Sequence, residues 1–125
     1  MLSLPSRTKM YLCMNPVDMR KSFDGLFGIV QQEFQQDPLN GHLFLFVNKR
    51  RDRMKAIFWD DDGFVIWYKR LEVGTWQLPV LTATTPATTP ALTLELEGHE
   101  LAMILRGIDL KSARRRARYQ PPVAV

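Results

Sequence analysis

The stretch from Gly41 to Glu72 constrains the fold more than any other part of the chain. It holds three runs rich in aromatic and β-branched residues, the types that pack well on a pleated sheet. The turn Asp60–Gly63 ends in Asp-Gly, and this pair favours the positive φ angles of a two-residue hairpin turn. The other turn, residues 49–53, is almost wholly charged and must face water. These features predict an antiparallel meander with one basic and one acidic turn, and with strands at about residues 42–48, 54–59 and 64–71.

A helical period precedes the meander. Apolar residues recur there at steps of three or four, as on one face of an α-helix. Both faces of the meander strands are apolar, so this helix can cover only one of them. The second face must be covered by the N-terminal strand, the C-terminal helix or another chain. The helix is expected at about residues 19–35, with Met19, Phe23, Leu26, Val30 and Phe34 on its apolar face.

Shorter elements complete the predicted fold. Strands are expected at about residues 8–14 and 92–96, and a small C-terminal helix at about 98–106. Residues 75–79 are a further candidate strand. The predicted fold class is therefore α+β: a curved antiparallel β-sheet of four to five strands, packed by the N-terminal helix, with the small C-terminal helix beyond it.

Length and composition predict one domain. The chain has 125 residues and a formal net charge of +4, which permits nucleic-acid binding without requiring it. We expect an α+β domain over residues 1–110 with a Thr/Pro-rich linker at about 80–93, and a basic tail at 111–125 that is disordered when free.

A single cysteine, Cys13, fits a reducing compartment. No signal peptide or long apolar span is evident, so the expected location is the cytoplasm, with no membrane partner.

Seven cations are expected to gather at the basic end of the meander. In an antiparallel arrangement the third strand runs back toward the first turn, so its last residues meet that turn. Such a cluster neutralises DNA phosphates and releases their counterions. A solvated, charged turn that protects the sheet edge accounts for the same residues equally well. The cluster consists of Lys49, Arg50, Arg51, Arg53, Lys55, Lys69 and Arg70.

Other groups of residues are weaker candidates for a functional site. Neighbouring carboxylates in Asp60–Asp62 point in different directions, and hairpin chemistry accounts for them without a metal ion. Cys13, His42 and His99 are too few and too scattered for a structural zinc site or for Cys/His catalysis. No metal or other cofactor is therefore expected. The strand aromatics fit either a core or a stacking platform for single-stranded nucleic acid.

Residues 15–26 (NPVDMRKSFDGL), 37–72 and 105–110 (LRGIDL) resemble the TnpB or Orf2 accessory protein of the insertion-sequence-sixty-six family of bacterial transposable elements. The resemblance implies a protein that assists transposition. It implies no known catalytic residues, and the strand-cleaving carboxylates belong to the transposase. The linker and the Arg-rich tail depart from the family, so no role is carried over to them. The matching positions where the resemblance places function are Asp18, Met19, Arg20, Lys21, Arg53, Asp60, Asp62, Trp67, Tyr68, Lys69 and Arg70.

These observations leave three hypotheses. The leading one is a non-enzymatic accessory protein that binds element DNA, the transposase or both, with Arg20 and Lys21 joining the seven cations as nucleic-acid-binding residues. The second is a protein–protein adaptor without DNA binding, whose partner is the transposase or a second copy in a homo-oligomer. The third and weakest is a metal-dependent nuclease that uses Asp60 and Asp62.

Overall fold

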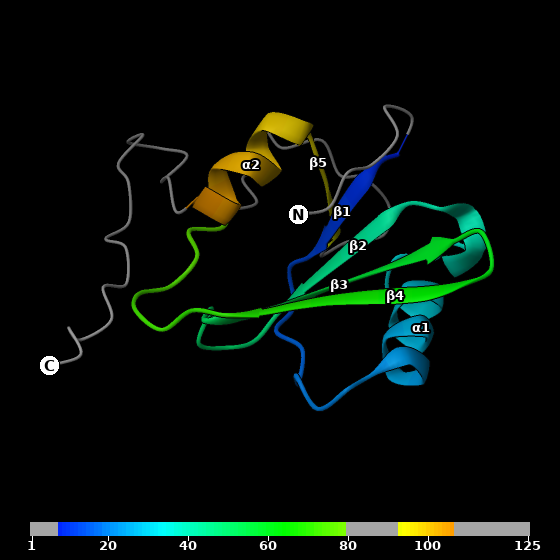
Figure 1. The fold of residues 1–125 in the computed structure, drawn as a ribbon, viewed down its shortest axis with the longest axis horizontal. Coiled ribbons are helices and arrows are strands. Elements are labelled where there is room, and N and C mark those ends of the chain that lie inside the picture. The colour runs from blue at the N-terminus through cyan, green and yellow to red at the C-terminus, as the bar shows by residue number, and fades with distance from the viewer. Residues whose placement is uncertain (1–7, 80–92, 107–125) are drawn as a thin grey trace, which may run out of the picture.

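The computed structural model describes residues 8–79 and 93–106, which form one five-stranded sheet with a helix on each face (Figure 1). Along the chain the elements are β1 (Met10–Cys13), α1 (Phe23–Gln32), the short 3₁₀ helix η1 (Pro38–Asn40), β2 (Leu43–Val47), β3 (Arg53–Asp60), β4 (Gly63–Arg70), β5 (Thr93–Leu96) and α2 (Gly98–Arg106). The strands lie in the order β4-β3-β2-β1-β5, so β4 and β5 are the edges. The predicted α+β fold class is confirmed, with an open sheet.

The predicted meander is confirmed, because β2, β3 and β4 pair antiparallel in sequence order. The acidic turn differs in one detail from the expected Asp-Gly loop. Its two loop residues are Asp61 and Asp62, whereas Gly63 already belongs to β4 and pairs with Asp60. Asp61 takes the left-handed conformation at φ 50°, which aspartate adopts more readily than most residues.

One pairing departs from the all-antiparallel sheet that we expected, because β1 lies parallel to β2. The connection between these two strands passes through α1 and η1, and such a crossover returns the chain to the end of the sheet where β1 began. β5 pairs antiparallel with the other side of β1. Residues 75–79 form no strand, and Trp76 within them is fully buried in the core instead.

Helix α1 is shorter at both ends than the predicted residues 19–35. Before it, the chain makes a separate turn in which the N–H of Lys21 donates to the C=O of Asp18 at 3.1 Å, and Ser22 then becomes the N-cap. Beyond it, Gln35 has a φ of 51°, a conformation through which a right-handed helix cannot continue. The apolar residues that follow a helical spacing in the sequence therefore continue beyond both ends of the helix.

The apolar face of α1 covers one side of the sheet. Leu26 and Val30 are fully buried, and Phe34 beyond the helix packs edge to face on Phe44 with ring centroids 5.0 Å apart. Phe23, which we expected on the same face, is instead 46% exposed at the start of the helix.

The C-terminal helix covers the opposite side of the sheet (Figure 1). α2 occupies the predicted residues, and its Leu101 and Ile104 are buried there together with Trp76. Of the three elements that could cover this face, namely the N-terminal strand, the C-terminal helix or another chain, the structure therefore uses the C-terminal helix. The strand residues buried beneath it are Leu12, Leu43, Leu45, Val47, Met54, Ala56 and Leu96.

Two predicted segments fall outside the described residues. These are the Thr/Pro-rich linker at about 80–93, apart from Thr93, which begins β5, and the basic tail at 111–125. Among the helices of the described ranges, none is long and apolar enough to cross a membrane.

Candidate functional site

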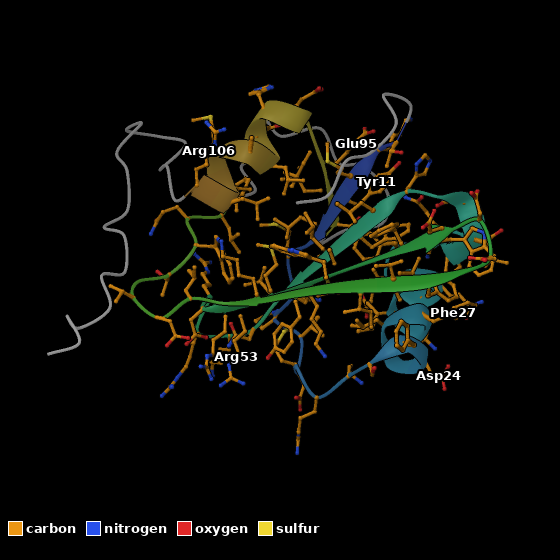
Figure 2. The ribbon with its side chains drawn as sticks, in the orientation of Figure 1. Tyr11, Asp24, Phe27, Arg53, Glu95 and Arg106 are labelled. Carbon is orange, nitrogen blue, oxygen red and sulfur yellow. The ribbon has the colours of Figure 1, made fainter. Side chains whose placement is uncertain are left out.

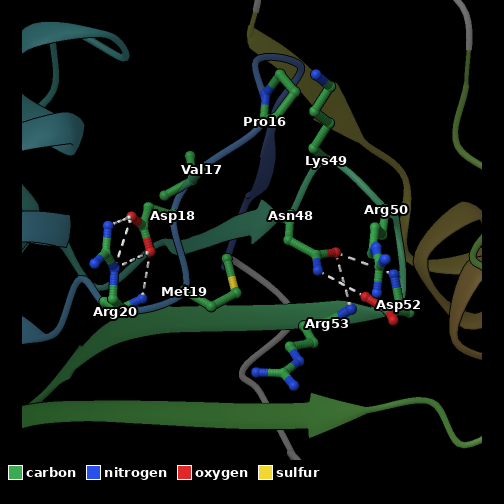
Figure 3. Close-up of a pocket in the computed structure, with 10 residues that line it drawn as sticks. All are labelled: Pro16, Val17, Asp18, Met19, Arg20, Asn48, Lys49, Arg50, Asp52 and Arg53. Atoms are coloured by element: carbon green, nitrogen blue, oxygen red, sulfur yellow. Dashed lines mark hydrogen bonds and ion pairs between the residues drawn. The ribbon is translucent and has the colours of Figure 1, made fainter.

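A cavity of about 470 Å³ lies between two segments that are far apart in the sequence (Figure 3). One wall is the connection after β1, and the other is the β2–β3 turn with its neighbours. The N–H of Val17 donates to the C=O of Val47 at 2.9 Å, which holds the connection against the end of β2. We call this the basic cavity, and it is lined by Pro16, Val17, Asp18, Met19, Arg20, Asn48, Lys49, Arg50, Asp52 and Arg53.

The side chain of Asn48 holds the β2–β3 turn in shape (Figure 3). Its Oδ1 accepts the backbone N–H groups of Asp52 and Arg53, each at 3.0 Å, and its Nδ2 donates to the Asp52 carboxylate at 2.6 Å. Backbone bonds close the same turn, because the N–H of Arg51 donates to the C=O of Asn48 at 3.0 Å. Arg51 itself takes a left-handed φ of 60°. The turn therefore presents its cations from a well-defined backbone.

Backbone hydrogen bonds from the chain after β4 also hold this turn in place. The N–H of Leu71 donates to the C=O of Asp52 at 2.7 Å, and the N–H of Trp76 donates to the C=O of Arg51 at 2.8 Å. The Trp76 side chain is fully buried in the core under α2. The turn therefore cannot move away from the sheet without disturbing that core.

Four exposed cations extend from this scaffold, namely Lys49, Arg50, Arg51 and Arg53. None of them forms an ion pair with another described residue. Arg53, labelled at this end of the sheet in Figure 2, donates from Nη1 to the Tyr68 hydroxyl at 3.5 Å. Uncompensated guanidinium and ammonium groups attract phosphates and carboxylates. The turn is therefore suited to bind an anionic partner.

Arg20, on the other wall, is already paired. Its Nη2 lies 2.6 Å from Oδ2 of Asp18, and its Nε lies 3.0 and 3.1 Å from the two carboxylate oxygens. Hydrogen bonds from Arg20 lower the pKa of the Asp18 carboxyl to about 2, so the pair stays charged at ordinary pH. The Arg20 side chain is 92% exposed. Arg20 is therefore accessible, but Asp18 offsets much of its charge.

Lys55 does not join the exposed cations. Its side chain is buried, with Nζ 2.7 Å from the C=O of Lys21 and 4.9 Å from the centroid of the Tyr68 ring. The ammonium thus binds the protein's own groups, and its position ties the segment before α1 to β3. Lys21 keeps its own ammonium on the exposed surface and forms no ion pair with a described residue.

The last two predicted cations are separated by the pleat of β4. Arg70 lies opposite Arg53 on the face that α1 covers, whereas Lys69 lies opposite Met54 on the face that α2 covers. Arg70 also pairs with Glu72, with Nη2 3.0 Å from Oε1. The seven predicted cations therefore lie near one end of the sheet without forming a single surface.

The acidic turn lies at the opposite end of the β3–β4 hairpin from the basic cavity. Its residues, Asp60–Asp62, are exposed and close the hairpin, which is the role that turn chemistry predicts. Within the two described ranges, no group of three or more His, Cys, Asp or Glu side chains is placed to hold a metal ion. Cys13 is buried, and this burial raises the pKa of its thiol.

Sequence reasoning missed two kinds of site residue. Asn48 and Asp52 had a usable signal, because an asparagine just before a charged hairpin turn is typical of side-chain bonding to the turn backbone. Pro16 and Val17 had none, because their place beside the turn depends on the crossover from β1 to β2.

Comparison with known proteins identifies the family. Residues 8–115 match the family described as IS66 Orf2 like protein. The chain belongs to this family. Two proteins of Sinorhizobium fredii (strain NBRC 101917 / NGR234) are similar to it: uncharacterized protein y4jC, 31% identical over 118 residues and 94% of each chain, and uncharacterized protein y4hO, 29% identical over 109 residues, 87% of this chain and 88% of the relative. No solved structure matches the chain significantly.

Membership of the IS66 Orf2-like family confirms the resemblance and supports an accessory role in transposition. The two segments that carried most of the resemblance, residues 15–26 and 37–72, supply the two walls of the basic cavity. The cavity therefore lies between the two motif segments on which the resemblance rested.

Proposed function

We propose that this protein is a non-enzymatic, cytoplasmic accessory factor that binds DNA at the ends of its element through the basic cavity. The observation that carries the proposal is the meeting of the two motif segments around a turn whose exposed cations have no ion-pair partner among the described residues. Phosphate oxygens are the natural ligands of such a turn, because arginine presents a planar fork of N–H donors to them.

The fixed backbone of the turn favours binding. The bonds from Asn48, Leu71 and Trp76 already order it, so less conformational entropy is lost when a ligand binds. We place the contact on Lys49, Arg50, Arg51 and Arg53, with Arg20, Lys21 and Arg70 at its margin. Lys69 faces the other side of the sheet, and Lys55 supports the fold.

The test measures binding to a fluorescent duplex that carries a terminal repeat of the element. Fluorescence anisotropy gives the affinity at each of a series of salt concentrations. Arg50→Ala combined with Arg53→Ala should weaken binding at low salt by roughly tenfold. Each phosphate contact contributes about −0.9 to the slope of log K against log salt, so the double variant should flatten that slope by about 2.

The matched control removes two cations from elsewhere. Lys9→Ala with Arg106→Ala makes the same change in net charge, and Figure 2 shows Arg106 on the opposite side of the sheet from Arg53. Binding by this control should stay within about twofold of the wild type. Undetectable binding by the wild-type protein at low salt, or equal losses in both double variants, would contradict the proposed DNA site.

The transposase is a second candidate partner, favoured by apolar surface around the same cavity. Tyr68, whose hydroxyl accepts a hydrogen bond from Arg53, is 47% exposed, and Met19 lines the cavity. Exposed aromatic side chains beside arginines are typical of protein interfaces. A pull-down from cells carrying the whole element separates the two partners. Transposase that stays bound after nuclease treatment indicates an adaptor, whereas transposase lost on nuclease treatment indicates a bridge through DNA.

A further inference from the structure

β4 is an edge of the sheet formed by the described residues, and alternate backbone groups of this strand point away from β3. In an antiparallel ladder, successive residues alternate between bonding to the neighbouring strand and facing outward. The bond from the N–H of Leu71 to the C=O of Asp52 fixes this alternation. The residues whose N–H and C=O groups face outward are therefore Phe64, Ile66, Tyr68 and Arg70.

The centre of this edge lacks the features that discourage pairing with another strand. Natural edges are usually short, bulged, interrupted by proline or charged in the middle. β4 pairs with β3 residue for residue over its whole length, without a bulge, and it contains no proline. Its central residues, 64–68, are the uncharged run FVIWY, and Tyr68 is 47% exposed. Such an edge is a template for one more strand.

The two ends of the edge carry opposite charge. Asp61 and Asp62 lie at one end, and Lys69 and Arg70 lie at the other. Arg70 is bonded to Glu72, but Lys69, Asp61 and Asp62 form no ion pair with any described residue. A second copy running antiparallel places the acidic end of each chain beside the basic end of the other. A parallel copy brings like charges together, which is unfavourable.

We propose that two copies of this protein pair antiparallel along β4, around a two-fold axis at Ile66, so that their two sheets become one. In this register outward-facing residues meet each other. Ile66 lies opposite its own copy, Phe64 opposite Tyr68, and Asp62 opposite Arg70. Aromatic and β-branched cross-strand pairs are favourable, and opposite charges directly across from each other add to them. The interface uses the same surface on both copies, so it closes at a dimer.

The dimer also sets the distance between its two basic cavities. The axis is perpendicular to the joined sheet, so both α1 helices and both copies of Arg53 lie on one face. Arg53 is four residues along β3 from Ile57, which pairs with Ile66 on the axis. With about 3.3 Å per residue and about 4.8 Å between strands, the two Arg53 residues lie roughly 30 Å apart. That distance is close to one turn of B-DNA, about 34 Å. The dimer itself forms without DNA.

Sedimentation velocity of the full chain without DNA tests the dimer. The variants exchange the charges of Asp62 and Arg70, the charged pair that faces across the proposed interface. Arg70→Asp alone places two carboxylates opposite each other, and Asp62→Lys alone places two cations opposite each other. Each variant should therefore self-associate at least about tenfold more weakly than the wild type. An equimolar mixture of the two should recover a dimer, because every contact in the mixed pair again joins opposite charges. Both positions are exposed, and circular dichroism checks that each variant remains folded.

A cysteine on the axis gives an independent measurement. A hydrogen-bonded antiparallel pair has a Cα–Cα distance of about 5.5 Å, within the range of a disulfide. Ile66→Cys should therefore give a covalent dimer on mild oxidation, whereas Val73→Cys, which is 43% exposed and lies outside the paired strands, should not. The proposal is overturned by a wild-type protein that stays monomeric through the micromolar range. It is equally overturned if both charge variants keep the wild-type dissociation constant, if their mixture fails to recover the dimer, or if Val73→Cys cross-links as readily as Ile66→Cys.

Discussion

Replacing Lys55 with methionine keeps most of the length and the apolar stem of the side chain but removes its ammonium group. In the wild type this ammonium donates to the C=O of Lys21 at 2.7 Å and lies 4.9 Å from the centroid of the Tyr68 ring. A hydrogen bond from a charged group contributes about 1.5–3 kcal/mol to stability. A cation–π contact adds about 0.5–1 kcal/mol.

One effect opposes these contributions. Lys55 is 8% exposed, so folding removes its charge from water at a cost that methionine does not have. The net loss in free energy of unfolding is therefore smaller than the sum of the contacts, and we expect about 1–2 kcal/mol. For a domain of this size, that loss lowers Tm by about 4–8 °C. Affinity for the terminal-repeat duplex should stay within about twofold of wild type, because the ammonium is held by the protein's own groups.

Calorimetry gives Tm, and anisotropy gives the DNA affinity of the same preparations. Lys49→Met is the matched control, since Lys49 is exposed and forms no ion pair among the described residues. Its Tm should change by less than about 2 °C, whereas its DNA affinity should fall. The reasoning is refuted if Lys55→Met leaves Tm unchanged and weakens DNA binding as strongly as the combined Arg50→Ala and Arg53→Ala change.

Three other perturbations test separate contacts. Asn48→Ala leaves two backbone N–H groups of the turn without their acceptor, so urea unfolding should show a loss of about 1–3 kcal/mol. Burial, and then the charge of Lys9, lower the pKa of His42 below its ordinary 6.5, so the unfolded chain binds this proton more readily. The stability that His42 contributes is therefore present above pH 6.5 and is lost as pH falls through the folded pKa, and His42→Gln should flatten this part of the pH profile of urea unfolding. The raised pKa and burial of Cys13 predict no reaction with iodoacetamide at neutral pH until urea unfolds the chain.

The elements of this fold are predictable where their signals are local. The meander follows from strand composition and from the acidic turn, and α2 follows from an apolar period between Gly98 and Arg106. The ends of α1 were misplaced because hydrogen bonds decide them: Asp18 organises a separate turn before the helix. The parallel pairing of β1 with β2 has no local signal, since it depends on where the crossover returns the chain.

The candidate site was predictable in its charge but not in its shape. The antiparallel direction of the third strand correctly predicted that Arg70 lies near the basic turn, where it pairs with Arg53. The alternation of side chains along β4 already implied that Lys69 faces the other way, once the register of the hairpin is known. Burial of Lys55 was beyond sequence reasoning, because its partner is a backbone carbonyl in a segment that the crossover places there.

The charges of the basic cavity limit how a single copy can hold DNA. Of its four lining cations, Lys49, Arg50 and Arg53 form no ion pair with a described residue, while Asp18 offsets Arg20. With Arg51, which the proposed contact includes, four phosphate contacts at about −0.9 each give a salt slope near −3.6, so affinity falls about 150-fold between 50 and 200 mM salt. One copy is therefore a weak binder at physiological salt unless another contact is added. The proposed dimer doubles the number of contacts on one face, and a transposase that binds beside Tyr68 adds its own. On either route the basic cavity positions the protein on DNA, and stable binding depends on the assembly.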